Sequence, residues 1–285
     1  MRRSLKNPTI LILTFEPNEQ APGYLKESFS ASVLRSLGIQ IRVLSLLSND
    51  DNRWGDITHR LSLSEVERPQ HFYMEQDANH TATHINLDGL PDDLSKYDLV
   101  HILSKWRGQV FQNFINICRE RGARKISVSC TDHTPLEEIS GCNVDISFYS
   151  NSTSHVVQED FRDHLPLPGK LLFVMHAERS IVICQGNYVT KVSINTNGKI
   201  SDQLQLGILE GCILGHLLSD THPVMAARFA MHVSQSYEND HQIIQDMPTI
   251  TEMGVDDRVA INAQQVEKVA HVVRMMPEAQ PFDYA

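Results

Sequence analysis

The first fifty residues already predict a fold class, because they contain a buried strand, a loop, a helix and a second strand in that order. Residues 9–15 form a short apolar run, residues 16–23 carry the glycine and prolines of a loop, and residues 39–47 are rich in β-branched side chains. Between them, residues 28–37 have helical spacing and end at Gly38, where a C-cap glycine belongs. This order predicts an α/β fold with a mostly parallel sheet covered by helices.

The same alternation returns after residue 90 and continues through most of the chain. Residues 53–90 interrupt it with two short runs, 60–63 and 71–74, which predict a small accessory β-sheet. No linker or repeat is visible, so we expect a single domain over residues 1–285. The remaining expected elements are strands at 99–103, 125–129, 144–148 and 171–175, a hairpin at 181–194, and helices at 109–121, 203–218, 222–236 and 263–276.

Composition excludes several classes of protein. The net charge is −10, and no Lys/Arg-rich run stands out beyond the N-terminal Arg2 and Arg3, which argues against binding to a nucleic-acid backbone. No apolar run has the length of a membrane span, and Glu16 and Glu19 follow the first apolar run too soon for a signal peptide. The five cysteines form no C-x-x-C pair, which predicts reduced thiols in a cytoplasmic protein.

A histidine pair suggests a metal site but does not establish one. His80 and His84 are four residues apart and would share a face if this segment were helical. The intervening residues 81–83 favour an extended chain, and no cysteine or carboxylate ligand is fixed nearby. We therefore predict polar loop histidines and no metal site.

Residues 197–211 carry the strongest functional signal. A polar turn runs into an apolar helix, with Ser201 or Asp202 at the expected N-cap. Unpaired N–H groups and the positive end of the helix dipole make such a helix start a site for anions such as phosphate. Asp202 is therefore either a simple helix cap or a proton acceptor beside a bound phosphate, and the local sequence leaves both interpretations open.

From residue 9 to residue 237 the order of elements resembles the ribokinase family, the PfkB-type sugar and nucleoside kinases. Residues 202–209 match the D-x-F-x-x-G-F-x continuation of that family's G-A-G-D signature. Residues 144–146 resemble the strand entering its N-x-x-E motif, and residues 174–183 resemble its T-x-G-x-x-G segment. The resemblance implies a ribokinase-like three-layer sandwich with a central mostly parallel sheet. It also implies a small β lid from about residues 16–24 and 53–86, through which such proteins dimerise.

The resemblance also implies roles for particular residues, with ATP and Mg²⁺ as cofactors. Asp202 would be the catalytic base. The other residues carried over are Lys199, Ile200 and Ser201 in an anion hole, Asn151 and Ala177 on the nucleotide and Mg²⁺ side, and Tyr24, Phe29 and Asp132 on the substrate side.

Several departures from the family pattern bear on activity. The G-A-G-D signature is Lys199-Ile200-Ser201-Asp202 here, so its glycines, which allow a phosphate to approach the backbone closely, are absent. The glutamate position of N-x-x-E holds Ser154, the nucleotide-side glycine position holds Ala177, and the sugar-contacting glycines fall near Tyr24.

Three functions remain open at this stage. The first is a kinase that transfers the ATP γ-phosphate to a hydroxyl of a sugar, nucleoside or related metabolite. The second is a ribokinase-fold protein that no longer phosphorylates and acts as a ligand-binding or partner subunit. The third is an enzyme of different chemistry on the same scaffold, because a fold does not dictate a reaction.

Overall fold

The structure is a computed structural model that describes most of the sheet and its covering helices. The described residues are 8–15, 23–45, 66–67, 74–76, 82–85, 87, 90–104, 109–130, 143–151, 169–176, 180–194, 203–239 and 259–265.

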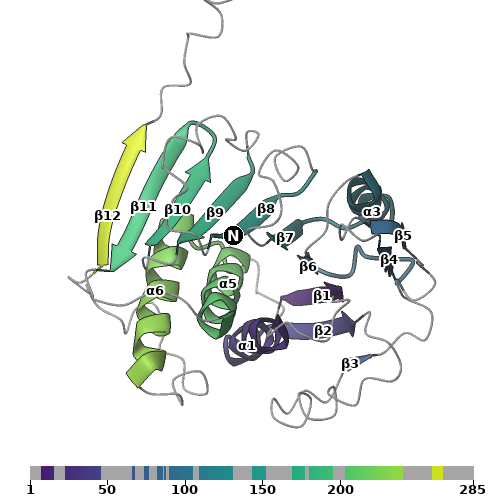
Figure 1. The fold of residues 1–285 in the computed structure, drawn as a ribbon, viewed down its shortest axis with the longest axis horizontal. Coiled ribbons are helices and arrows are strands. Elements are labelled where there is room, and N and C mark those ends of the chain that lie inside the picture. The colour runs from purple at the N-terminus through teal and green to yellow at the C-terminus, as the bar shows by residue number, and fades with distance from the viewer. Residues whose placement is uncertain are drawn as a thin grey trace, which may run out of the picture.

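A ten-stranded sheet runs through the molecule in the order β12-β11-β10-β9-β8-β7-β6-β1-β2-β3 (Figure 1). Seven neighbouring strands of this sheet are parallel to one another: β9, β8, β7, β6, β1, β2 and β3. The other three are antiparallel to their neighbours, because β10 runs opposite to β9, β11 opposite to β10 and β12 opposite to β11. The mostly parallel sheet predicted from the sequence is therefore confirmed. The strands are β1 (Thr9–Phe15), β2 (Gln40–Ser45), β3 (Val66–Glu67), β6 (Leu99–Ser104), β7 (Ile126–Cys130), β8 (Ile146–Asn151), β9 (Leu171–His176), β10 (Ser180–Gln185), β11 (Tyr188–Ile194) and β12 (Val259–Gln265).

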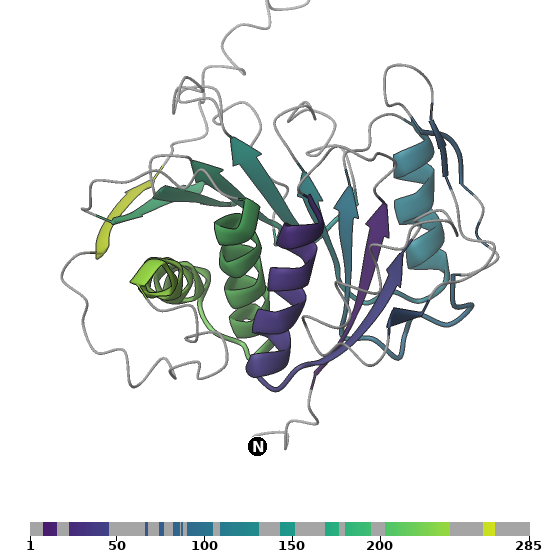
Figure 2. The same cartoon turned by 60° about the horizontal axis from the view of Figure 1, so that its bottom comes forward.

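Helices cover both faces of this sheet. The helices α1 (Gly23–Ser36), α5 (Gln203–Leu218) and α6 (Pro223–Asn239) lie together on one face, and α3 (Gln109–Glu120) lies on the other (Figure 2). Each face has its own apolar core, and successive residues of the central strand β1 alternate between the two: Ile10 and Ile12 pack under α1 and α5, whereas Leu11 and Leu13 face α3. This arrangement confirms the predicted three-layer sandwich.

A second, two-stranded antiparallel sheet consists of β4 (Met74–Gln76) and β5 (Ala82–Ile85), and β5 packs beside α3 (Figure 1). His84 lies in β5, opposite Glu75, so this segment is extended as expected. The lid remains a prediction, because most of residues 16–24 and 53–86 lie outside the described residues. Residues 23 and 24, which we expected in the lid, belong to α1.

Two further boundaries differ from the sequence-based expectation. Helix α1 begins at Gly23 rather than near residue 28. Residues 24–27 are compatible with a helix, and glycine is accepted at a helix start. The prediction of a helix over residues 263–276 is wrong for residues 263–265. These residues belong to β12, which pairs with β11 along its whole length, so sheet pairing overrides the helix propensity of Ala263.

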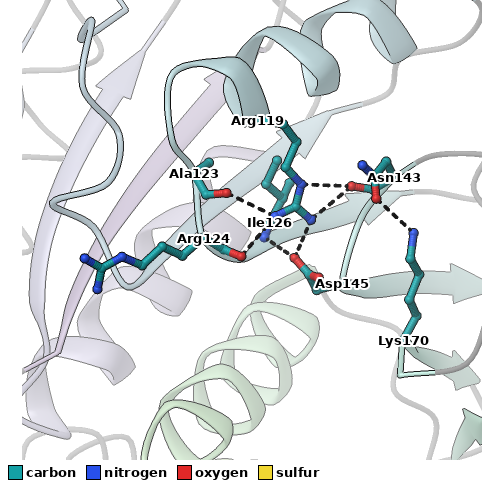
Figure 3. A network of polar contacts seen from close by, with 7 residues as sticks. All are labelled: Arg119, Ala123, Arg124, Ile126, Asn143, Asp145 and Lys170. Atoms are coloured by element: carbon teal, nitrogen blue, oxygen red, sulfur yellow. Dashed lines mark hydrogen bonds and ion pairs between the residues drawn. The ribbon is translucent and has the colours of Figure 1, made fainter.

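A polar network ties α3 to the amino edge of the sheet (Figure 3). Arg119, at the end of α3, donates from Nη2 to Asp145 Oδ2 over 2.6 Å, and the same oxygen accepts the Ile126 N–H at 2.7 Å. Arg119 also donates to the backbone carbonyls of Ala123, Arg124 and Asn143. Since Ile126 begins β7 and Asp145 directly precedes β8, the network joins three elements where the strands start.

Candidate functional site at the carboxyl edge of the sheet

The starts of α1 and α5 lie at the edge where the parallel strands end. Helix α1 follows β1 and returns the chain to the start of the parallel strand β2, so its own first residues must lie at the carboxyl edge. Helix α5 runs alongside α1 in the same direction. Gly211 approaches Ser30 and Val33, and one turn later Gly215 approaches Leu34 and Leu37.

The contact at Gly211 requires glycine. A Cβ atom at this position would lie 2.8 Å from the backbone carbonyl oxygen of Ser30 and 2.9 Å from Cβ of Val33. Neither atom belongs to the flexible end of a side chain, so any larger residue would force the two helices apart. Gly211 therefore fixes how closely α5 packs on α1.

A polar cluster lies inside the apolar core between α5 and the sheet, and consists of His101, Ser127, Ser129 and Glu210. The Ser129 hydroxyl donates to Oε1 of Glu210 at 2.8 Å, and Nε2 of His101 lies 3.9 Å from Oε2 of the same carboxylate. Nδ1 of His101 lies 2.8 Å from Oγ of Ser127, its partner across the β6–β7 ladder. The cluster thus connects α5 to two neighbouring strands.

The cluster is enclosed by the core. The side chains of His101 and Glu210 are both 0% exposed, and the Phe148 ring meets the His101 ring edge-to-face with centroids 6.2 Å apart. A buried carboxyl group in such surroundings needs hydrogen-bonding or polar partners. Ser129 donates a hydrogen bond to Oε1 of Glu210, and Nε2 of His101 lies 3.9 Å from Oε2.

The first turns of α5 extend past the ends of the strands. Glu210 lies level with Ser129, the second-last residue of β7. Seven residues separate Gln203 from Glu210, which corresponds to a rise of about 10 Å along the helix. The N–H groups of the first turn, which have no acceptor within the helix, therefore lie at the carboxyl edge of the sheet, where α/β folds bind ligands.

The structure places three of the residues predicted for the site, by their backbone positions. Asn151 ends β8 beside His176, the last residue of β9, and both lie at the carboxyl edge. Tyr24 is in the first turn of α1 rather than in a loop, and Phe29 follows five residues later in the same helix. The other predicted residues, Asp132, Ala177, Lys199, Ile200, Ser201 and Asp202, lie outside the described residues, although α5 begins directly after Asp202.

The described cysteines are free thiols in the core. Burial raises the pKa of Cys118 and of Cys184 to about 12, and it raises that of Cys212 further. Thiols with such pKa values stay protonated at neutral pH and are poor nucleophiles. Cys130 is buried as well and forms no disulfide.

Two further findings concern the described part of the chain. Among its residues, no group of three or more His, Cys, Asp or Glu side chains is arranged to hold a metal ion. No helix within it is long and apolar enough to cross a lipid bilayer.

The cluster around Glu210 was not among the residues predicted from the sequence, although a signal was present. Glu210 is the one carboxylate in the mostly apolar run of residues 203–218. Ser127 and Ser129 are two residues apart in a buried strand, which places them on one face, and His101 interrupts the apolar strand 99–103. Polar residues inside elements predicted to be buried are the pattern that would have revealed it.

Known proteins resemble this chain in their structures but not in their sequences. No protein-family model and no curated protein matches the sequence. Among solved structures, a possible 1-phosphofructokinase from Thermotoga maritima matches with a TM-score of 0.58 and 14% identity over 90% of this chain and 99% of its own. A pyridoxal kinase from Staphylococcus aureus, in complex with pyridoxal, matches with a TM-score of 0.52 and 7% identity over 92% and 100%. A ribokinase from Thermotoga maritima matches with a TM-score of 0.50 and 11% identity over 86% and 96%.

These likenesses, together with the parallel sheet and the placement of α1 and α5, define the class of the protein. It is a doubly covered α/β protein of the ribokinase-like fold, as the sequence predicted. At identities of 7–14%, the likenesses show the fold and leave the activity to be inferred from the site.

Proposed function

We propose that the chain is a small-molecule kinase that transfers the γ-phosphate of ATP to a hydroxyl group of a sugar, nucleoside or related metabolite. The observation that carries the proposal is the start of α5 at the carboxyl edge of the parallel sheet, directly after Asp202. Solved structures of the same fold that are named as kinases of fructose phosphate, ribose and pyridoxal support it.

In this proposal each group at the edge has one task. The first-turn N–H groups of α5, with the amides of Ile200 and Ser201, hold the transferring phosphate, and Lys199 adds positive charge. Asp202 accepts the proton of the attacking hydroxyl. Bound ATP with Mg²⁺ supplies the phosphoryl group.

The residues on the nucleotide and acceptor sides complete the assignment. Asn151 would position the Mg²⁺–nucleotide, since its amide oxygen is a ligand of the kind that Mg²⁺ prefers. We assign Ala177 to the nucleotide side as well. We assign Tyr24, Phe29 and Asp132 to the acceptor side, where the aromatic residues favour a less polar acceptor than ribose.

A second candidate function rests on a specific observation in the sequence. Lys199, Ile200 and Ser201 stand where glycines would allow a phosphate to approach the backbone, and Ser154 stands where a carboxylate would organise Mg²⁺. These replacements favour a ribokinase-fold protein that binds a ligand or partner without phosphorylation. In both cases we propose a cytoplasmic protein that dimerises through the β lid; a monomer in light scattering at high concentration contradicts the dimer.

The test is calorimetric titration with ATP and Mg²⁺ of the wild type and of Asp202→Asn, followed by a screen of sugars, nucleosides and pyridoxal for ADP release. We expect both proteins to bind ATP with similar affinity, and kcat of the variant to fall by about 10²–10⁴-fold, as for loss of a general base. The matched control is Asp92→Asn, since Asp92 is fully exposed and distant from the edge.

The results separate the two functions. Binding without turnover of any acceptor by the wild type favours the ligand-binding protein. No binding of ATP at millimolar concentration excludes the kinase.

A further inference from the structure

We propose that Glu210 is a positioning residue that, through Ser129 and His101, sets the place of the α5 N-terminus at the carboxyl edge. The proposal deepens the proposed function and rests on it for its kinetic readout. Its structural readout stands independently. Nothing in the predicted site includes Glu210, which is buried more than two helical turns from Asp202.

A carboxylate at this place has no evident benefit for stability. Helix α5 packs in a core of fully buried side chains, including Leu209, Ile213 and Leu214, so that Glu210 and His101 form a polar pair in apolar surroundings. Replacing buried charged groups with apolar side chains of similar volume is often neutral or stabilising. The carboxylate supplies what apolar packing lacks, because a hydrogen bond requires a particular distance and angle between its two groups.

The contacts of Glu210 fix both the height and the rotation of the helix. Oε1 accepts the hydrogen bond from Ser129 of β7 at 2.8 Å, and Oε2 lies 3.9 Å from Nε2 of His101 of β6. Because the two oxygens face two different strands, neither sliding nor rotation of α5 leaves both contacts intact. The contact of His101 with Ser127 at 2.8 Å holds the imidazole ring in place from its other side.

The adjacent residue anchors α5 in a third direction. Gly211 is in close contact with Ser30 and Val33 of α1, so within two consecutive residues the helix is attached to β6, β7 and α1. The helix start lies about 10 Å from this anchor, so a tilt of about 6° moves it by about 1 Å. A displacement of 1 Å at a reacting group can reduce the rate by about a hundredfold.

The experiment compares Glu210→Leu, Glu210→Gln and Ser129→Ala with Leu214→Ala. Leu214 lies one turn further along α5, is 0% exposed and makes a purely apolar contact with the core, so its truncation weakens the helix without removing a directional contact. The readouts are hydrogen exchange at the amides of residues 206–210 and 214–218, and kcat and KM for ATP at a temperature at which every variant is folded.

For Glu210→Leu we expect exchange at residues 206–210 to rise at least tenfold with residues 214–218 unchanged. We also expect kcat to fall about ten- to a hundredfold, with KM for ATP changing less. Glu210→Gln keeps an acceptor for Ser129, so it should restore most of kcat, and Ser129→Ala should shift both readouts in the direction of Glu210→Leu by a smaller amount. Leu214→Ala should lower the unfolding temperature without the local exchange pattern or the loss of kcat.

Two results overturn the proposal: wild-type exchange in Glu210→Leu, or the same pattern and kcat loss in Leu214→Ala. If Glu210→Leu does not fold, Ser129→Ala decides by the same criteria. If the wild type binds no ATP, the kinase proposal fails on its own, and the exchange pattern still decides whether Glu210 positions the helix start.

Discussion

Two polar networks act on opposite sides of the same sheet, and they differ in what surrounds them. The network of Arg119 lies at the amino edge, where the side chains of Arg119 and Asp145 are 22% and 33% exposed. The network of Glu210 lies in the core, where Glu210 and His101 are 0% exposed. Arg119 donates hydrogen bonds mainly to backbone carbonyls, whereas Glu210 accepts one from the Ser129 side chain and faces the His101 side chain.

The difference separates a stabilising role from a positioning role. Arg119 donates hydrogen bonds to backbone carbonyls in the segments that link α3 to β7 and lead into β8. Its side chain stays 22% exposed, so the guanidinium group keeps part of its hydration. Glu210 and His101 lose all contact with water, so their pairing roughly offsets the cost of their burial. Their value is in where they hold α5.

The largest expected effect comes from breaking the core network on one side. His101→Leu removes the polar ring beside the buried Glu210 carboxyl group and should lower the free energy of unfolding by about 3–5 kcal/mol, the range for breaking one side of a buried pair. The double variant His101→Leu/Glu210→Met removes both polar side chains and should recover most of this loss while its kcat remains low. Urea denaturation measures the stabilities. A double variant as unstable as His101→Leu contradicts the view that the pair is retained for position.

A smaller effect is expected at the amino edge. Arg119→Met removes an ion pair and several hydrogen bonds to carbonyls, and should lower the free energy of unfolding by about 1–3 kcal/mol without changing ATP affinity. Its neighbour Arg124 is the matched control, since the Arg124 side chain points away from the network (Figure 3). Arg124→Met should change stability by less than about 0.5 kcal/mol. Equal effects in urea denaturation would show that the network contributes little.

The smallest expected effect on stability comes from His216, a largely buried histidine outside the core network. His216, near the end of α5, packs on Phe229 with ring centroids 4.2 Å apart, and burial lowers its pKa from 6.5 to about 4. The folded state therefore binds fewer protons than the unfolded state, so this residue reduces stability as pH falls from about 6.5 towards 4. Because the side chain is partly exposed, we expect a loss of about 1–2 kcal/mol.

The His216→Gln variant isolates this contribution. The difference in unfolding free energy between wild type and variant should change by that amount between pH 7 and pH 4 in urea titrations. A difference that does not depend on pH contradicts the lowered pKa.

Much of the fold was predictable because the signals were local. The strand 99–103, the helix 109–121 and the hairpin after residue 181 have clear periodicity, and each lies where it was expected. The error at residues 263–265 arose because an alanine-containing segment with weak propensity pairs with β11, a contact distant in sequence. The start of α1 was predicted about five residues too late, because a glycine can stand either in a loop or at the first position of a helix.

The site was predictable only in outline. The order of elements indicates that α1 starts at the carboxyl edge, because it directly follows β1 and must lead back to the start of the parallel strand β2. The cluster of His101, Ser129 and Glu210 was not predicted. The sequence marks each of them as a polar residue in a buried element, but which of them meet depends on the face of α5 that turns towards β7. The roles of Asp202, Lys199 and Asp132 remain predictions.

Gly211 has a mechanical consequence for the whole edge. A Cβ atom at this residue would meet the backbone of α1, so the two helices pack at a separation that only glycine allows. A larger residue there would spread the first turns of α1 and α5 at the carboxyl edge. The width of that edge is therefore set by a residue that belongs to neither helix start.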